Sequence, residues 1–539
     1  MKIHFNNATI IDGSGDTAFL GSVLVEGNRI MKVLKADESA SDNLTFAEDY
    51  LNIDLKGQVL APGFIDSHSH NDWFCLKDDV RPYFDSFVKQ GITSLVAGNC
   101  GFSATGFSED SPYLDDLGGE LFNLNAQERR AEFADWMQAI DGRVPINVAS
   151  LIGHGTARLA VAGIPQTELT AEQEEQMLVL LEQGLKQGAA GISLGLMYAP
   201  GLFAPTSELE KVADLCAKYD RILTVHPRAE SAISLNFGGY LRSHLLQALD
   251  ELDHLTRKSG CRFEYSHLIF VGRRSWKDID EALAILEKLE SDGFEVGFDM
   301  YPFDYGASVI TVVLPEWYQR LPKTERKKRS VYLKLKLMLG LTVRLLGFGF
   351  DDIVLAYAGE KHPDYNGYTI SEIAKQQKRA PLDVYLEVCE DSDFKARVLM
   401  GGYQNDEMVE RLMCHPMSVY MTDAWYEEKG IQNGGIYGAF PRFLKIAREK
   451  NMPLEMIVHK MTGKSAQRFS IDKRGLIREG YYADLVIFDP DRVSDNVKLD
   501  AKSGCPGISR VYVNGNLQFS ADQGLTKMRN NSGESIFVR

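Results

Sequence analysis

Two histidines that are close in the sequence are the first residues with the chemistry of a metal site. His68 and His70 lie two residues apart at the end of the apolar run 64–70. Alternate residues of a β-strand face the same side, so both imidazoles can reach one ion. A buried imidazole pair without an ion would leave polar nitrogens that need other partners. The pair therefore indicates a metal site more strongly than either histidine alone.

Four further candidates end other short apolar runs of the chain, and these are Cys100, His226, His267 and Asp423. An isolated cysteine or histidine is more often a packed core residue than a ligand. Their joint placement at predicted strand ends is what favours a ligand role. We therefore expect all six side chains to converge on one cavity.

The types of donor in this set favour zinc. Thiolate and imidazole ligands suit zinc, whereas magnesium and calcium prefer shells made only of oxygen. Zinc would polarise an amide carbonyl and lower the pKa of a bound water to about 7. Asp423 is then the predicted catalytic residue, because a carboxylate at that place can take a proton from the attacking water and pass it to the leaving amine.

The elements that must position these residues follow an alternating β and α pattern between residues 61 and 474. Short apolar strand candidates are separated by helical patterns, which is typical of a parallel sheet in the α/β class. The eight strand candidates are 64–70, 93–100, 146–153, 189–196, 222–226, 263–269, 295–301 and 418–423. Eight repeats predict a (β/α)8, TIM-like barrel, whose chemistry sits at the carboxyl ends of the strands.

Two of the intervening helices carry capping signals. Thr170 with Gln173, and Ser207 with Glu210, have the spacing of a capping box before an apolar helical pattern. Residues 1–60 and 475–539 instead show short alternating strands separated by turns. We expect the two chain ends to build one small β-sandwich domain together.

The barrel pattern fails between the seventh and eighth strands, where more than one hundred residues intervene. So long a connection predicts an inserted lid or subdomain, at about 304–415. Within it, residues 323–336 are rich in Lys and Arg, and residues 335–350 are mostly apolar. We favour an amphipathic helix pair over the barrel mouth here, rather than a contact with a membrane surface.

Composition excludes several classes of protein. The chain has 539 residues, with 59 Lys and Arg against 75 Asp and Glu, and its net charge of −16 repels nucleic acid. A run of about 18 apolar residues, which a membrane span needs, is missing from the sequence, and the first residues do not resemble a secretion signal. The seven cysteines are scattered and odd in number, unlike a disulfide framework. We expect a cytoplasmic protein.

Several stretches resemble the N-acyl-D-amino-acid deacylases, or D-aminoacylases, of the amidohydrolase superfamily. The similar stretches are 61–70, 97–103, 152–156, 195–201, 226–230, 299–302, 438–442 and 474–486. The stretches around Cys100 and Tyr198 are the narrowest signals for the deacylase branch. The resemblance implies a zinc-dependent hydrolase that cleaves an N-acyl-D-amino acid, a small molecule, into a carboxylate and a free D-amino acid.

The resemblance also implies roles for individual residues. It gives Cys100, His226 and His267 as a tight zinc site, and His68, His70 and Asp423 as a second site that is weaker or empty. Arg228, two residues after His226, is expected to hold the substrate carboxylate with its planar fork. The remaining substrate-binding candidates are Tyr198, Tyr301 and Ser308.

Other functions stay open at this point. A dihydroorotase-like or hydantoinase-like cyclic amidase, or a dipeptidase for unusual linkages, would use a similar ligand set. The cyclic amidases of the superfamily bridge two metals with a carboxylated lysine on the fourth strand, and residues 189–196 contain no lysine. A non-catalytic scaffold barrel is disfavoured because all six ligands are present. Selectivity for the D form rests on the resemblance alone, and a homo-oligomer is left open.

Overall fold

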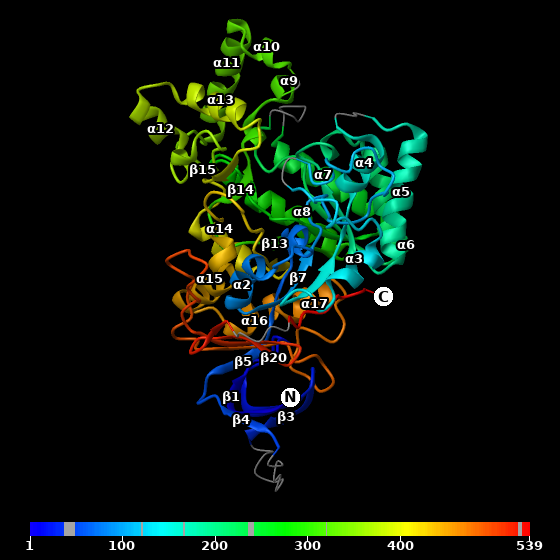
Figure 1. The fold of residues 1–539 in the computed structure, drawn as a ribbon, viewed down its shortest axis with the longest axis vertical. Coiled ribbons are helices and arrows are strands. Elements are labelled where there is room, and N and C mark those ends of the chain that lie inside the picture. Colours follow the sequence, from blue (N-terminus) through cyan, green and yellow to red (C-terminus); the bar gives the residue numbers. More distant parts are fainter. Residues whose placement is uncertain are drawn as a thin grey trace.

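The computed structural model describes residues 1–36, 49–119, 122–164, 168–234, 242–319, 321–525 and 531–538. Eight parallel strands form the barrel at the centre of the molecule. Figure 1 labels two of them, β7 and β13. In chain order they are β6 (Phe64–Asp66), β7 (Ile92–Ala97), β8 (Asn147–Ser150) with its continuation β9 (Ile152–Gly153), β10 (Gly191–Gly195), β11 (Ile222–His226), β12 (Arg262–Tyr265), β13 (Val296–Met300) and β17 (Ser418–Tyr420). Each predicted strand is present, and the barrel is confirmed.

The barrel closes between its first and last strands. Strands β6, β7 and β8 pair in one run, and β9 through β13 pair in a second run that ends with β17. Across the seam, the backbone N–H of Asp423 donates to the carbonyl of His68 at 3.1 Å. The buried Asp66 carboxylate accepts two bonds from Thr422, at 2.9 Å from its backbone and 2.6 Å from its hydroxyl. Closure therefore ties together two strand ends that carry predicted ligands.

Helices follow the strands and cover the outside of the barrel. They are α2 (Arg81–Lys89), α3 (Phe133–Ile140), α4 (His154–Ala162), α5 (Ala171–Lys186), α6 (Thr206–Lys218), α7 (His244–Ser259), α8 (Ile279–Ser291), α14 (Asp406–Cys414), α15 (Gly435–Glu449), α16 (Leu454–Met461) and α17 (Gly463–Arg468). Short 3-10 turns lie at η1 (Asn71–Phe74), η2 (Gly201–Phe203), η3 (Trp276–Asp278), η4 (Ile310–Val313) and η5 (Pro363–Tyr365).

The two predicted capping boxes have different outcomes. Thr170 and Gln173 form the box at the start of α5, as expected. The box expected at Ser207 is wrong: α6 already begins at Thr206, after Pro205, and no side chain caps it. Because Ser207 lies inside the first turn, its backbone is helical and it cannot take the extended conformation of an N-cap.

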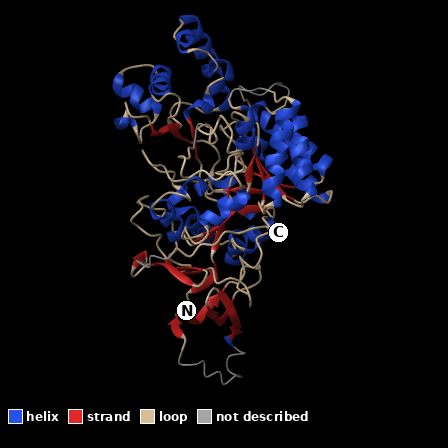
Figure 2. Cartoon of the chain, turned by 45° about the vertical axis from the view of Figure 1, so that its right-hand side comes forward, coloured by secondary structure: helices blue, strands red, loops and turns tan. Residues whose placement is uncertain are grey.

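Strands from both chain ends form one nine-stranded sheet around its own core, seen at the N-terminal end in Figure 2. They are β1 (Lys2–Ile10), β2 (Phe19–Glu26), β3 (Arg29–Lys35), β4 (Leu51–Asp54), β5 (Val59–Pro62), β18 (Leu485–Phe488), β19 (Ile508–Val513), β20 (Asn516–Ser520) and β21 (Gly524–Leu525). The predicted β-domain is therefore present, with β5 extending slightly past residue 60.

The last described residues leave this sheet. The backbone of Ile536 donates to Val148 on the barrel, and the backbone of Val538 donates to Gly188. Both apolar side chains are buried against barrel residues, which is the physical reason that the tail returns there. The domain boundaries at 60/61 and 474/475 stay predictions.

An inserted subdomain separates β13 from α14 and projects away from the N-terminal sheet (Figure 1). Its antiparallel sheet has the order β14 (Gly306–Val309), β16 (Arg397–Met400) and β15 (Ile353–Tyr357). Its helices are α9 (Glu316–Gln319), α10 (Lys323–Arg326), α11 (Arg329–Leu346), α12 (Ile370–Gln377) and α13 (Pro381–Asp391). The helix pair expected at 323–350 consists of the short α10 and the long α11, and α11 ends at the left-handed Gly347.

The bounds of the subdomain, at about 304–415, stay a prediction; α14 packs against the barrel strand β17. Across the described part of the chain, helices that combine the length and the apolar character of a membrane span do not occur.

Candidate metal centre

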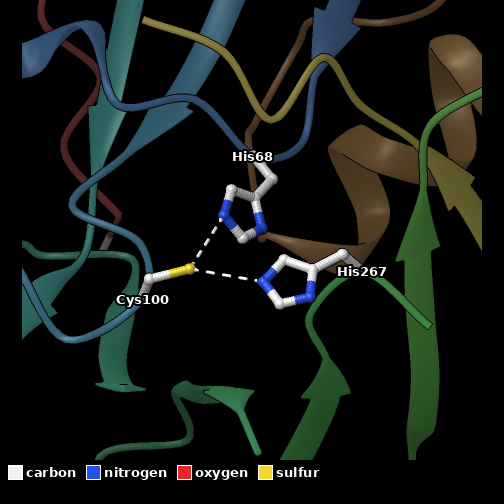
Figure 3. A group of neighbouring side chains, drawn as sticks. All are labelled: His68, Cys100 and His267. Atoms are coloured by element: carbon white, nitrogen blue, oxygen red, sulfur yellow. Dashed lines mark hydrogen bonds between the residues drawn. The ribbon is translucent and has the colours of Figure 1, made fainter. Parts of the chain in front are cut away.

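The structure brings all six predicted ligands together at the carboxyl ends of the barrel strands. Figure 3 shows the side chains of His68, Cys100 and His267 directed toward one another. The Cys100 sulfur lies 3.2 Å from His68 Nε2, 3.5 Å from His267 Nε2 and 3.7 Å from His226 Nδ1. His226 Nδ1 and His267 Nε2 are 2.8 Å apart. Four donors from four strands therefore surround one small volume.

Asp423 and His70 complete the group from the seam of the barrel. Asp423 Oδ1 lies 3.5 Å from His68 Nε2 and 3.4 Å from His70 Nε2. The two imidazoles face each other through their Nε2 atoms, which are 3.3 Å apart. The donor atoms of His68, His70 and Asp423 all lie within 4.8 Å of one another, as do those of His68, Cys100 and His267. Two overlapping three-donor clusters thus share His68.

The chemistry of these donors fits a transition metal. Burial would raise the pKa of the Cys100 thiol, but the charge of His68 and hydrogen bonds from His226 and His267 outweigh burial and hold that pKa well below its usual range. Thiolate is the form of cysteine that binds metals. Buried imidazoles, a thiolate and a carboxylate at these separations match the nitrogen, sulfur and oxygen ligands that zinc takes.

Three of the six candidate ligands have strained backbones. Cys100, His267 and Asp423 adopt left-handed conformations, with φ of 51°, 38° and 47°. Such conformations cost about 1–3 kcal/mol each in residues other than glycine and gather at functional sites. Gly195 shows how tightly the chain approaches here, because a Cβ at that position would lie 2.1 Å from the Cys100 carbonyl oxygen. The strain turns the three side chains inward just past their strands.

Two buried carboxylates that we did not predict support the histidines. Asp299 Oδ2, on β13, lies 3.1 Å from His68 Nδ1, and its other oxygen accepts the backbone N–H of His267. Glu230 Oε1 lies 2.6 Å from His267 Nδ1. Carboxylates behind metal-binding imidazoles fix the ring orientation and raise its basicity. An acidic residue inside the apolar strand 296–300 was the available signal for Asp299.

We expect Asp299→Asn to weaken metal binding about 10- to 100-fold, because the carboxylate no longer orients the His68 ring. Equilibrium dialysis of the purified protein against a chelator series measures this change. Glu208→Gln is the matched control, since Glu208 is also buried and pairs with His154 and Arg158 away from the six ligands. Unchanged metal affinity in Asp299→Asn would contradict the expectation.

Three of the four predicted substrate-binding residues face the centre. Tyr198 donates to the Cys100 carbonyl at 2.9 Å, and its ring lies 5.0 Å from that of His226. Tyr301 lies at the end of β13 and Ser308 lies on β14, and both line the larger cavity beside the centre together with Tyr198. The structure therefore places all three on the wall of this cavity.

Arg228 is not brought to the cavity. Its Nε donates to Glu251 at 2.8 Å, and its two terminal nitrogens donate to the carbonyls of Leu202 and Ala204. It is not one of the residues that line the two cavities at the centre. The expectation that its fork faces the mouth is corrected, because a neighbouring acid and two carbonyls hold the guanidinium.

Two cavities meet at the metal centre and share eight lining residues, which are Met197, Tyr198, His226, His267, Ala307, Ser308, Val312 and Asp423. Their volumes are about 1210 Å³ and 1070 Å³, each including the solvent at the mouth. The inserted subdomain supplies an apolar wall of the larger one, made of Val312, Val313, Leu339, Val343, Leu346, Phe348, Phe350, Ile353 and Met400. Within the described chain, neither cavity is lined by Lys or Arg.

A (β/α)8 barrel with imidazole, thiol and carboxylate donors at the carboxyl ends of its strands defines a metal-dependent hydrolase class. The sequence model of the amidohydrolase family matches residues 52–310 and 358–519, and the chain belongs to this family. It is therefore a metal-dependent hydrolase.

Three proteins are similar to this chain over most of its length. The N-acyl-D-aspartate deacylase of Alcaligenes xylosoxydans xylosoxydans is 30% identical over 94% of this chain and 90% of its own. A D-aminoacylase structure with a binuclear metal centre has a TM-score of 0.78 and 28% identity, covering 99% of both chains. The N-acyl-D-glutamate deacylase of Bordetella bronchiseptica, complexed with zinc and a phosphonate inhibitor, has a TM-score of 0.80 and 26% identity, covering 100% of this chain and 99% of its own.

Proposed function

We propose that this protein hydrolyses the amide bond of N-acyl-D-amino acids, releasing a carboxylate and a free D-amino acid. The observation that carries the proposal is the convergence of six donor groups beside two cavities, four of them buried and two, His226 and Asp423, half-buried. Similarity to the N-acyl-D-aspartate deacylase over 94% of the chain supports the substrate class and its handedness.

We propose that zinc is the metal, held tightly by Cys100, His226 and His267. His68, His70 and Asp423 would form a second, weaker site, and the D-aminoacylase described with a binuclear centre supports this arrangement. When bound, zinc lowers the pKa of a coordinated water to about 7 and polarises a carbonyl oxygen.

The proposed role of Asp423 is proton transfer. Burial would raise its pKa, but the hydrogen bond from His70 and the charge of His68 outweigh burial and lower that pKa below its usual value. The carboxylate is therefore ionised and can accept a proton from the attacking water. Delivery of that proton to the leaving nitrogen avoids the release of an unstable amide anion.

Neutral hydroxyls are the proposed partners of the substrate. Burial raises the pKa of Tyr301 and of Tyr198 well above the usual value, so both phenols keep their protons. Tyr301 and Ser308 can donate to the carboxylate of the substrate, while Tyr198 shapes the wall beside His226. With these donors in use, a second carboxylate on the substrate would meet no cation on the described walls.

We expect N-acyl-D-leucine, N-acyl-D-methionine and N-acyl-D-phenylalanine to be better substrates than N-acyl-D-glutamate, by about 100-fold or more in kcat/KM, because an unpaired carboxylate is costly in an apolar cavity. A hydrolysis panel of D and L substrates with the zinc-loaded enzyme measures this preference. Equal or faster cleavage of the acidic substrate would contradict it, without affecting the proposed reaction.

The same panel tests the reaction itself. A zinc-loaded enzyme that hydrolyses no N-acyl amino acid of either hand would overturn the proposal. Faster cleavage of dihydropyrimidine or hydantoin rings than of any linear amide would assign the chain to the cyclic amidases instead. Cleavage of dipeptides alone would assign it to the dipeptidases.

We also propose a reducing compartment, the cytoplasm, for this enzyme. All seven cysteines lie in the described part of the chain, and none forms a disulfide there. Disulfides are rare in reducing compartments, where cysteines stay as free thiols.

A further inference from the structure

Helix α11 of the inserted subdomain is apolar on two opposite sides. Its inner side buries Leu335, Leu339 and Leu346, and Leu339 and Leu346 line the larger cavity. Its outer side carries leucines at every fourth position, which places them in one stripe along the helix. The apolar face of a helix normally packs against other apolar groups, so the outer stripe is a candidate contact surface.

The outer stripe is unusually exposed for leucine. The exposed fractions of its members are 53% for Leu333, 74% for Leu337, 57% for Leu341 and 36% for Leu345. Contiguous exposed apolar patches on soluble proteins mark interaction sites more often than single exposed residues do. The stripe lies in a segment, 311–357, that is outside the match to the family model. Features that the family shares therefore do not explain the leucine stripe.

Positive charge is concentrated in the segment that carries the stripe, although the whole chain carries a net charge of −16. Three of its cations are paired, Lys323 and Arg326 with Glu390 and Lys328 with Glu325. Residues 323–346 contain eight Lys and Arg and a single acidic residue, Glu325. Arg329, Lys336 and Arg344 are exposed on α11 and form no ion pair with any described residue. Lys334 lies over the Trp317 ring at 4.0 Å, beside the stripe.

The exposed leucines and the positive charges together favour an anionic lipid surface as the partner. A two-fold contact with a second copy would bring the cations of both copies together, and like charges across an interface are costly. An anionic lipid surface satisfies both features, because leucines enter the boundary between headgroups and acyl chains while Lys and Arg pair with the headgroups. Lys and Arg recur along the whole length of α11, so the helix would lie in the plane of the surface.

We propose that the outer face of α11, formed by Leu333, Leu337, Leu341 and Leu345 with Lys334, Lys336 and Arg344, docks on an anionic membrane surface. The proposal does not depend on the substrate, because it rests on the outer side of the helix. Docking would place the inserted subdomain, and the cavity that α11 lines from within, next to the lipid boundary.

Vesicle flotation of the full-length protein tests this proposal. We expect binding to vesicles of phosphatidylglycerol and phosphatidylcholine to be at least about tenfold stronger than binding to phosphatidylcholine alone, given the contribution of each cation near an anionic surface. Binding should weaken in about 0.5 M salt, which screens exposed charges. No binding to the anionic vesicles, or equal binding to neutral ones, would overturn the proposal.

The double variant Leu337→Glu/Leu341→Glu should lose vesicle binding by about tenfold or more, because it removes two apolar anchors and adds two negative charges. Leu20→Glu/Leu51→Glu is the matched control, since both leucines are exposed, at 62% and 55%, on the β-domain, and the charge change is the same. The control should bind as the wild type does. An equal loss in the control would overturn the proposal.

Two further measurements distinguish lipid docking by α11 from unfolding of the variants and from pairing of two copies of the chain. Lys334→Gln/Lys336→Gln leaves the leucines in place and should reduce both binding and its salt dependence. Thermal unfolding of every variant should match that of the wild type, as expected for exposed positions. A concentration-dependent dimer in analytical ultracentrifugation that Leu337→Glu disperses would assign the face to a second copy and overturn the proposal.

Discussion

Asp423→Asn is expected to lower kcat by about 10²- to 10⁴-fold while the tightly bound metal is retained, which is the usual contribution of a positioned acid or base. The asparagine keeps the size of the side chain and one oxygen near His68 and His70, from which Asp423 Oδ1 is 3.5 Å and 3.4 Å away. It cannot take up a proton from water. Steady-state kinetics with a favoured substrate and metal analysis of the same preparation measure both quantities.

The control for this variant is a change at the adjacent residue. Thr422→Ala removes the hydroxyl bond to the buried Asp66 carboxylate at the barrel seam but leaves the Asp423 side chain in place. We expect a smaller loss of kcat there, below about tenfold, since the proton-transfer group is intact. A kcat for Asp423→Asn within about threefold of the wild type would remove Asp423 from the mechanism, given the contribution expected of such a group.

Cys100→Ser is expected to abolish tight metal binding, with a loss of affinity of about 100-fold or more, since a hard hydroxyl replaces the soft thiolate that zinc favours. The Cys100 sulfur lies within 3.7 Å of three histidine nitrogens. Metal content after dialysis measures the loss. Activity should return only partly when zinc is supplied in excess.

Thermal unfolding gives a second readout of the same change. A ligand at about 100 times its dissociation constant stabilises the folded state by about 2.7 kcal/mol, so zinc should raise the Tm of the wild type but not that of Cys100→Ser. Cys216→Ser is the matched control, because Cys216 is buried in α6 away from the six ligands and should keep the zinc response. A Cys100→Ser protein that keeps one tightly bound zinc would contradict the assignment of the thiolate.

Most of the candidate site could be predicted from the sequence because a parallel barrel makes position along a strand equivalent to position in space. All eight strands have their carboxyl ends on one face, so a residue that ends a strand is near that face whatever its distance in the sequence. Cys100 and Asp423 are more than three hundred residues apart, yet both lie just past a strand end. Donor type at strand ends was therefore a sufficient signal.

The sequence did not predict the direction in which side chains point. Arg228 follows His226 by two residues, and spacing alone directed it to the cavity, but Glu251 on α7 holds its guanidinium elsewhere. Glu230 and Asp299 were not predicted to belong to the site, although they contact His267 and His68. Their part in orienting these rings depends on contacts between different strands. The orientation of a charged side chain depends on the charged groups packed around it, and these groups belong to distant segments of the chain.

Local patterns along the chain were enough to predict the barrel, the β-domain from both chain ends and the six donors, because periodicity and strand-end position carry that information. Packing between distant segments set which carboxylates stand behind the histidines, where Arg228 points and which side of α11 remains exposed. These outcomes depend on burial and on pairing between charges far apart in the chain. Local sequence patterns contain no information about either. The apolar wall that α11 adds to the cavity, and the leucine stripe on its outer side, belong to this second group.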